Sequence, residues 1–328
     1  MRVAVLGSNS FAGADFVDLL LESERFDVLG ISRSPEKAPP FLAYARRSRD
    51  RFRYCRLDLN ADHAELAALL DGFRPDFLVN FAAQGDEAAS WAHPQDFFQT
   101  NCVALARLVD HLAAGRYLRR FLQISSSSVY GAPPEAVTET SALAPRSPYA
   151  VSKAAADLLL LAYEENADFP VQIMRPPNIY GAYQQLFRIV PKSIIRLKRG
   201  DTIELHGGGY AVRSYLHVRD ASRAALAILE HGRSGEVYNV SPDDVHRIRD
   251  VVAVVCDLLG RDFEAATCEV EDRRGQTSLS RFDSSKIRRE LGWAPQVSLR
   301  EGIAGVLGWL ETDWDRFMGE QLVYMHQA

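Results

Sequence analysis

Short apolar runs alternate with amphipathic stretches through the first half of the sequence. The runs are RVAVLG, DVLGIS, FLVNFAA, RFLQIS and VQIMR. The stretches between them have helical periodicity and include Phe11–Leu21, Asp62–Leu70, Gln95–Ala114 and Pro148–Glu165. Strands that are continuously apolar are buried on both faces, and intervening helices supply the cover. The pattern therefore predicts an α/β fold with a doubly wound parallel sheet.

The alternation loosens after about residue 176. Loops become longer, and the segments HGGGYAVRSYLHVRD and EDRRGQTSLSRFD mix Gly, Arg and aromatic residues. We expect a smaller mixed α/β lobe over the carboxyl edge of the sheet, where doubly wound folds bind ligands. Residues 1–176 plus about 211–240 are assigned to a dinucleotide-binding domain. About 177–210 and 241–328 are assigned to a substrate lobe.

Charge and cysteine usage exclude several classes of protein. The formal net charge is −5, so neither nucleic acid nor an anionic membrane is an expected partner. We expect no signal peptide, because the N-terminal apolar run is short, and no apolar run is long enough to span a bilayer. Reduced thiols and a cytoplasmic location are expected, because the four cysteines form no CxxC pair. His206 and His217 are isolated from second ligands, so no metal site is predicted.

The first strand, turn and helix read VAVLGSNSFAGADF. Gly7 and Gly13 stand where a Rossmann-type dinucleotide fold needs a tight turn and a close approach of helix and strand. Ser10 replaces the middle glycine, and the helix that begins at Phe11 would favour a phosphate at its N-terminus. These four residues are candidate cofactor contacts, and a helix cap without a ligand is the alternative.

The end of the second apolar run bears on the choice between NAD and NADP. NAD sites tend to place an acid there, whereas NADP sites prefer Arg and hydroxyl groups. The sequence has Ser32, Arg33 and Ser34 and no acid. We therefore expect NAD or NADP with a preference for NADP; an Arg33 that is simply solvated is the alternative.

Tyr149 and Lys153 form a YxxxK pair on one face of a predicted helix. Ser147 can cap this helix, and Pro148 suits its first turn. An unperturbed phenol has a pKa of about 10, too high for a base at neutral pH. A nearby ammonium group, the helix N-terminus and an oxidised nicotinamide would all lower that pKa. An ordinary amphipathic helix is the alternative.

Taken together, these segments resemble the extended short-chain dehydrogenase/reductases of the nucleotide-sugar epimerase/dehydratase family. The resemblance covers nearly the whole chain in the expected order. It is carried by GSNSFAG, Asp58-Leu59, NFAAQ, Asn101, SSSSVYG, SPYAVSK, RPPNIYG, RSYLHVRD and SSKIRRELGWAP.

The resemblance implies roles for the matched side chains. Tyr149 would be the catalytic base, Lys153 its electrostatic partner and ribose ligand, and Ser126 the hydroxyl that binds the reacting sugar oxygen. Further cofactor contacts are implied for Asp58, Leu59, Ala82, Ala83 and Asn101. Substrate contacts are implied for Gln84, Ser127, Ser128, Asn178, Arg213 and Arg274, with Arg213 clamping the diphosphate of a nucleotide-diphosphate sugar.

The serines after Ser126 bear on the reaction. In this family Tyr149 would take a proton from a sugar hydroxyl while hydride passes to the nicotinamide. A 4,6-dehydratase must also remove the C5 proton and expel the C6 hydroxyl, and an Asp–Glu pair commonly follows its catalytic Ser or Thr. Ser127 and Ser128 stand there instead. We therefore predict an NAD(P)-dependent nucleotide-sugar 4-epimerase, which needs no such acid.

Three other functions stay open. EDRRGQTSLSRFDSSKIRRELGW and FFQTN look more like the 4,6-dehydratases, with Glu139 as a replacement carboxylate. An inactive dinucleotide-binding regulator is the second alternative, although Tyr149, Lys153 and Ser126 are all present. A reductase of free carbonyl compounds fits less well with Arg213 and the large C-terminal lobe.

The family often dimerises through a four-helix bundle, so a homodimer through Gln95–Ala114 and Pro148–Glu165 is expected.

Overall fold

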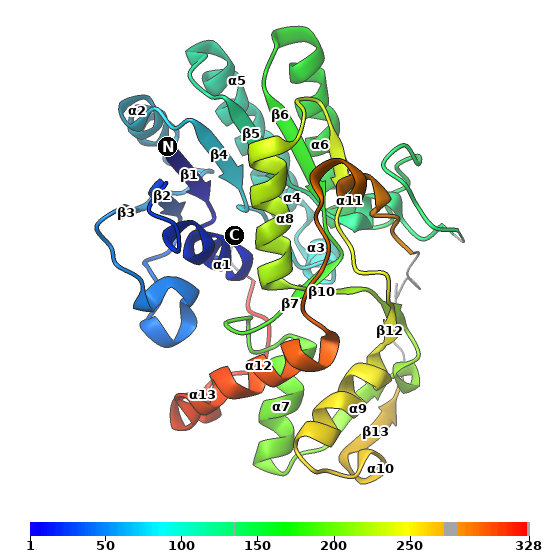
Figure 1. Ribbon diagram of the computed structural model, residues 1–328. Coiled ribbons are helices and arrows are strands. Elements are labelled where there is room, and N and C mark those ends of the chain that lie inside the picture. Colours follow the sequence, from blue (N-terminus) through cyan, green and yellow to red (C-terminus); the bar gives the residue numbers. More distant parts are fainter. Residues whose placement is uncertain (134, 272–280, 327–328) are drawn as a thin grey trace.

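A seven-stranded sheet forms the centre of the computed structural model, which describes residues 1–133, 135–271 and 281–326 (Figure 1). Its strand order is β11-β6-β5-β4-β1-β2-β3, and every neighbouring pair is parallel. The strands are β1 (Arg2–Leu6), β2 (Asp27–Ser32), β3 (Phe52–Arg56), β4 (Phe77–Asn80), β5 (Arg120–Ile124), β6 (Val171–Arg175) and β11 (Val237–Asn239). Strand order reverses at β1, so the predicted doubly wound, Rossmann-type sheet is confirmed.

Helices cover both faces of this sheet. Helices α1 (Phe11–Leu21) and α8 (Val218–His231) pack on one face, and α2 (His63–Phe73), α5 (Leu105–Gly115) and α6 (Pro148–Ala167) pack on the other. Along β1, Val3 and Val5 belong to the first core and Ala4 and Leu6 to the second. Alternate strand residues point to opposite faces, which explains why these strands are apolar throughout.

The stretch predicted as one helix over Gln95–Ala114 is interrupted. It consists of α4 (Pro94–Phe98), a π-helical turn (Gln99–Ala104) and α5. Two strands of the central sheet were also absent from the sequence analysis, the edge strand β3 and the three-residue β11. Strand β3 carries two arginines in FRYCR, because an edge strand needs no fully apolar sequence.

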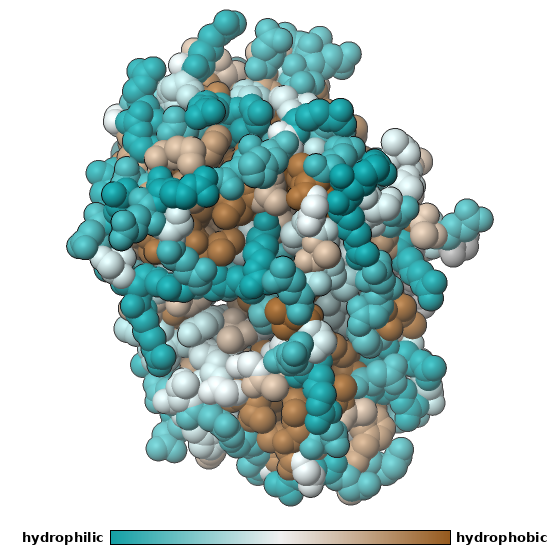
Figure 2. Space-filling view, viewed as in Figure 1, coloured by the Kyte–Doolittle hydropathy of each residue, from teal (hydrophilic) through white to brown (hydrophobic). Residues whose placement is uncertain are grey.

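A smaller lobe lies below the sheet in Figure 1. Helices α7 (Ile189–Arg199), α9 (Ile248–Leu258) and α12 (Leu299–Glu311) enclose its core, which β8 (Ile203–His206) also lines. Figure 2 shows apolar side chains gathered over this lobe on a face that is otherwise mostly hydrophilic. The other strands are β7 (Asn178–Tyr180), β9 (Val212–Arg213), β10 (Tyr215–His217), β12 (His246–Arg247) and β13 (Thr267–Val270). The other helices are α3 (Ala89–Ala92), α10 (Phe263–Ala266), α11 (Ser285–Leu291) and α13 (Trp314–Gly319).

One part of the assigned substrate lobe contacts the central sheet layer. Helix α11 packs on α8 and β11, and Trp293 Nε1 donates a hydrogen bond to the Asp220 carbonyl oxygen at 3.1 Å. The domain boundaries given above stay a prediction. Among the helices that the structure describes, none combines the length and apolar character needed to cross a bilayer.

Candidate active site

The turn between β1 and α1 is packed against the end of β4. Gly7 has φ of +75°, and a Cβ there would lie 2.7 Å from the Ala82 nitrogen. A Cβ at Gly13 would lie 2.2 Å from the Gly7 oxygen. Ser10 Oγ caps α1 by accepting from the Gly13 nitrogen at 3.1 Å, and Phe11 is buried. Both glycines are therefore required by close backbone approach, as a dinucleotide-binding turn demands.

Asn9, which the sequence analysis did not select, ties this turn to the loop after β2. The Asn9 nitrogen donates to Ser32 Oγ at 2.9 Å, and Asn9 Nδ2 donates to Ser34 Oγ at 2.8 Å. Both serine hydroxyls accept these bonds and keep their own protons to donate. The Arg33 carbonyl oxygen accepts from Arg56 Nε at 3.1 Å. Ser32 and Arg33 thus stand beside the glycine turn.

The remaining candidate cofactor residues follow β3 and β4. Asp58 Oδ1 accepts from the Asn60 nitrogen at 2.8 Å, and Leu59 packs against the second core. Ala82 and Ala83 follow β4, next to the glycine turn.

Asn101 joins the segment after β4 to helix α6. The buried Gln84 donates its main-chain N–H to Asn101 Oδ1 at 2.9 Å, and Asn101 Nδ2 donates to the Gln84 carbonyl oxygen at 3.1 Å. Asn101 Nδ2 also donates to Ser152 Oγ at 2.9 Å, one residue before Lys153. The π-helical turn carries Asn101, in keeping with the frequent occurrence of π-bulges at functional sites.

Tyr149, Lys153 and Ser126 are brought together at the carboxyl ends of β5 and β6. Ser147 Oγ caps α6 by accepting from the Ala150 nitrogen at 3.2 Å, which places Tyr149 in the first turn. Ser126 lies two residues after β5 and caps the short helical turn that follows, where its Oγ accepts a hydrogen bond from the Ser128 nitrogen at 3.1 Å. A hydrogen bond with Ser126 favours the Tyr149 phenolate.

The pKa of Tyr149 differs from the sequence-based expectation. Burial of the hydroxyl outweighs the hydrogen bond with Ser126 and raises the pKa of Tyr149 above its usual value. Lys153 is 2% exposed, and its Nζ donates to the Ile124 carbonyl oxygen at 2.7 Å. Burial lowers the pKa of Lys153 to about 8, and the charge of Asp157 opposes that shift. In the chain by itself, desolvation therefore has a larger effect on Tyr149 than the lysine does.

A buried polar network lies beneath Lys153. Asp157 is fully buried one helical turn after Lys153, and its Oδ2 accepts from Arg175 Nε at 2.9 Å. Arg175 Nη1 also donates to the Tyr130 hydroxyl at 2.8 Å, and that hydroxyl donates to Asn239 Oδ1 at 2.8 Å. The sequence analysis missed this network. The i+4 spacing of Asp157 from Lys153 was the signal that could have found it.

Glu87 is a second residue that sequence reasoning missed. Its Oε1 accepts a hydrogen bond from Ser147 Oγ at 2.8 Å, and its charge raises the pKa of Tyr149. The Glu87 side chain is solvent-exposed, so it stands at the open side of the site. Nothing in the composition of QGDEAAS distinguishes this acid from an ordinary loop residue.

The other acids close to the site have structural partners. Asp86 forms an ion pair with Arg188 at 3.5 Å. Glu139, considered above as a replacement carboxylate, accepts from the Asn239 nitrogen at 2.9 Å and so holds its loop to β11. Ser127 is buried and Ser128 is half-buried in the turn that follows Ser126.

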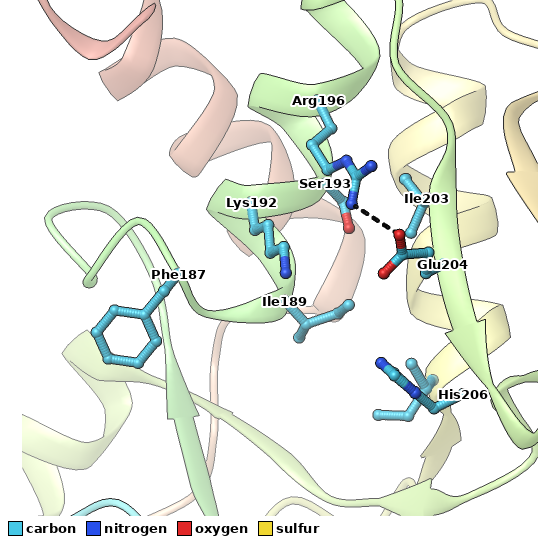
Figure 3. A pocket seen from close by; sticks show the side chains of 9 residues that line it. Phe187, Ile189, Lys192, Ser193, Arg196, Ile203, Glu204 and His206 are labelled. Atoms are coloured by element: carbon cyan, nitrogen blue, oxygen red, sulfur yellow. Dashed lines mark ion pairs between the residues drawn. The ribbon is translucent and has the colours of Figure 1, made fainter. Parts of the chain in front are cut away.

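The smaller lobe contains a pocket of about 160 Å³ (Figure 3). It is lined by Phe187, Ile189, Lys192, Ser193, Arg196, Ile203, Glu204, His206 and Ile248. Asn178 and Arg213, both candidate substrate contacts, lie on β7 and β9 and are not among these residues. Arg274 lies outside the described residues.

Residues 3–241 match the protein family described as "NAD dependent epimerase/dehydratase family". Among curated relatives, dTDP-glucose 4,6-dehydratase from Xanthomonas campestris pv. campestris is 33% identical over 285 residues. That alignment covers 78% of this chain and 81% of the relative.

Two solved structures match nearly the whole fold. A crystal structure of dTDP-glucose 4,6-dehydratase from Streptomyces venezuelae with NAD bound has a TM-score of 0.86, at 30% identity over 96% of this chain and 98% of that one. UDP-glucuronic acid 4-epimerase from Bacillus cereus, in complex with UDP-glucuronic acid and NAD, has a TM-score of 0.87 at 25% identity, covering 95% and 99%. The comparisons support the dehydratase alternative better than the epimerase interpretation.

Proposed function

The chain belongs to the NAD-dependent epimerase/dehydratase family, and on this premise we propose that it is a nucleotide-sugar 4,6-dehydratase. The observation that carries the proposal is the similarity to dTDP-glucose 4,6-dehydratases, at 33% identity in sequence and 30% in a solved structure. The substrate is a nucleotide-diphosphate sugar, and the product is the 4-keto-6-deoxy sugar. Since the family acts on sugars, this reading is preferred to an inactive regulator or a reductase of free carbonyl compounds.

The residues at the sheet edge fit a dinucleotide. The close packing at Gly7 and Gly13 leaves the main chain bare where a pyrophosphate would lie. A bound nicotinamide supplies the hydride acceptor for the sugar carbon. Ser126 holds the reacting hydroxyl, and Tyr149 takes its proton. The raised pKa of Tyr149 means that the phenolate needs added positive charge beside it, from the ammonium of Lys153 and from the oxidised ring.

Glu87 is our candidate for the carboxylate that the dehydratase reaction requires. It is bonded to Ser147, two residues before the catalytic tyrosine, and its charge acts on that tyrosine. In the proposed step, Glu87 takes the C5 proton and gives a proton to the C6 hydroxyl, which leaves as water and leaves a C5=C6 double bond. That double bond would then take back the borrowed hydride at C6 and a proton at C5, which gives the 4-keto-6-deoxy sugar with no net change in the cofactor. Glu87 would thereby do the work of an Asp–Glu pair at the positions of Ser127 and Ser128.

Replacing Glu87 with Gln should lower formation of the 4-keto-6-deoxy product roughly 10²–10⁴-fold, because an amide cannot take the C5 proton. Sugar oxidation should persist, so a single turnover should still reduce the nicotinamide. Glu139→Gln is the matched control, since its amide oxygen can still accept from the Asn239 nitrogen. Dehydration by E87Q at the rate of E139Q would contradict the role of Glu87.

A second candidate, 4-epimerase, is favoured by the serines at positions 127 and 128, which leave the turn after Ser126 without an acid. Purified protein with added NAD is incubated with dTDP-glucose, UDP-glucose and UDP-glucuronic acid, and the products are identified by mass and NMR. A product lighter by one water supports the dehydratase. A C4 epimer of unchanged mass overturns it in favour of the epimerase.

The cavity in the smaller lobe is our candidate for the nucleoside and diphosphate. The ring of Phe187 offers a stacking surface for a base, and Lys192 and Arg196 offer positive charge, although Arg196 also lies 3.9 Å from Glu204. Asn178, Arg213 and Arg274 remain proposed diphosphate contacts.

The preference for NADP over NAD stays a prediction. If Arg33 contacts the extra phosphate, Arg33→Ala should weaken NADP binding by tenfold or more, on the order of 1.4 kcal/mol, and leave NAD binding almost unchanged. Fluorescence titrations with both cofactors measure this difference. Equal affinities for NAD and NADP in the unmutated protein would remove the preference.

A homodimer through α4, the π-helical turn, α5 and α6 is also proposed, as is a cytoplasmic location. Helices α4 and α6 pack side by side, and they and the intervening turn expose Phe98 (38%), Val103 (41%), Val151 (39%) and Leu158 (58%). Leu158→Glu should convert a dimer to a monomer in light scattering. Met318→Glu, at an exposed apolar residue outside this patch, is the control. A monomeric unmutated protein would contradict the proposal.

A further inference from the structure

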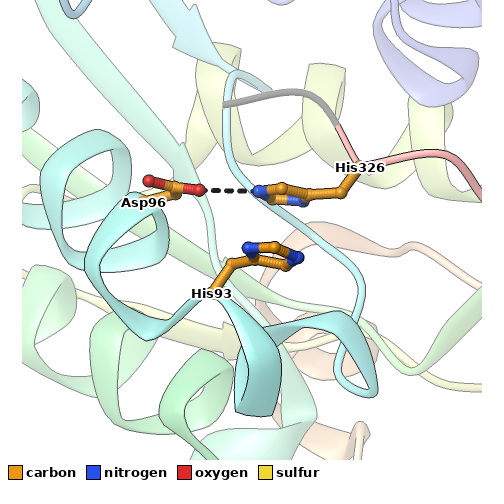
Figure 4. A group of neighbouring side chains, drawn as sticks. All are labelled: His93, Asp96 and His326. Atoms are coloured by element: carbon orange, nitrogen blue, oxygen red, sulfur yellow. Dashed lines mark hydrogen bonds and ion pairs between the residues drawn. The ribbon is translucent and has the colours of Figure 1, made fainter.

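The C-terminal segment returns to the start of α4 and places a histidine there. His326 Nε2 lies 2.7 Å from Asp96 Oδ2, although the two residues are 230 positions apart in sequence. The His93 ring stacks on the His326 ring, with centroids 4.1 Å apart and planes at 7° (Figure 4). One ligand atom from each of the three residues lies within 4.8 Å of the others.

Two imidazoles and one carboxylate form a ligand set that zinc and related ions prefer. With metal–ligand bonds of about 2.0–2.1 Å, tetrahedral ligands lie roughly 3.3 Å apart, so the ligand atoms must draw closer and the stacked His93 ring must tilt toward the ion. His93 is solvent-exposed, whereas His326 and Asp96 are half-buried. The Tyr324 hydroxyl lies 3.2 Å from His326 Nδ1 and orients the ring so that Nε2 faces Asp96.

We propose that His93, Asp96 and His326 bind a divalent transition-metal ion, with water as the fourth ligand. Two ligands come from the start of α4 and the third from the C-terminal segment, so the ion fastens that segment to the sheet domain. This departs from the sequence-based prediction of no metal site, because the sequence gives no sign that His326 lies beside Asp96.

The proposed ion lies close to the candidate active site. The Phe97 ring is parallel to the His326 ring at 6.2 Å and meets the Tyr149 ring edge-on, also at 6.2 Å. Along the same segment, the Tyr324 ring packs edge-on against Phe187, which lines the cavity of the smaller lobe. Metal binding therefore fixes a segment that runs from the nucleotide cavity to the wall beside the catalytic tyrosine.

The test uses full-length protein without an affinity tag, since a histidine tag would itself bind the probe. Zn²⁺ is titrated calorimetrically, and Co²⁺ is titrated while its visible absorption is recorded, because tetrahedral cobalt absorbs strongly. We expect about one ion per chain. His93→Ala, Asp96→Asn and His326→Ala should each weaken binding roughly tenfold or more, and His231→Ala, remote in α8, should not.

Hydrogen exchange gives a second measurement that does not depend on activity. With Zn²⁺ present, amide exchange in residues 320–326 should slow in the unmutated protein and stay unchanged in H326A. Failure of the unmutated protein to bind Zn²⁺ or Co²⁺ would overturn the proposal. Equal binding by all three site variants would also overturn it, because the ion would then lie elsewhere.

Discussion

Tyr149→Phe is expected to lower turnover roughly 10²–10⁴-fold while cofactor affinity stays close to that of the unmutated protein. The substitution removes the oxygen that we propose accepts the sugar proton as a phenolate, and it leaves the ring, which packs edge-on against Phe97. Lys153 keeps its bond to the Ile124 carbonyl oxygen. Proton transfer is therefore lost without disturbing the cofactor cleft.

The measurement combines steady-state rates on the active nucleotide sugar with a fluorescence titration of the cofactor. Tyr163→Phe is the matched control. Tyr163 lies on the same helix, and its hydroxyl donates a surface hydrogen bond to Asp110 Oδ1 at 3.3 Å. Near-normal turnover by Y149F would show that another group takes the proton. Loss of cofactor binding would show a structural rather than a catalytic defect.

Asp157→Asn should destabilise the fold by roughly 3–5 kcal/mol, the usual cost of removing one partner from a buried ion pair. Asp157 is fully buried and 2.9 Å from Arg175, which is itself 3% exposed. It also supplies negative charge to Lys153, whose pKa burial has already lowered to about 8. The amide would leave two buried cationic side chains without a counter-charge.

Urea unfolding followed by circular dichroism measures this loss. Glu165→Gln, an exposed acid on the same helix, is the control and should change stability by less than about 1 kcal/mol. A second measurement is the pH at which Lys153 loses its proton. That pH should fall in D157N, because Asp157 favours the charged lysine. Equal stability of D157N and E165Q would contradict this account of the network.

The central sheet could be predicted from sequence because its strands are buried on both faces. RVAVLG and RFLQIS correspond to β1 and β5, and the helix predicted over Phe11–Leu21 has the same bounds in α1. Strand β3 could not be found in this way, since its edge position permits arginines. The break in the Gln95–Ala114 helix was also missed, because apolar periodicity does not report hydrogen-bond spacing.

The residues of the candidate site also differ in how far sequence patterns could predict them. The YxxxK spacing pairs Tyr149 with Lys153, and the family resemblance added Ser126 to them before the structure did. Glu87 depends on a contact across the fold with Ser147, which no local pattern encodes. Asp157 stands four residues after Lys153, but its contact with Arg175 also joins distant parts of the sequence. The comparisons favour the dehydratase alternative over the epimerase interpretation. The sequence shows that acids are missing after Ser126, whereas Glu87, our candidate carboxylate, comes from a different loop.

The side-chain amide of Asn101 has a consequence for how the protein responds to ligands. It contacts both Gln84 and Ser152, so it cross-links the segment after β4, the irregular turn and helix α6. We expect these three parts to act as one preorganised unit that loses little entropy when the proposed cofactor binds. Structural adjustment on binding would then be confined to the peripheral loops, and the geometry of the proposed proton transfer would be set in advance.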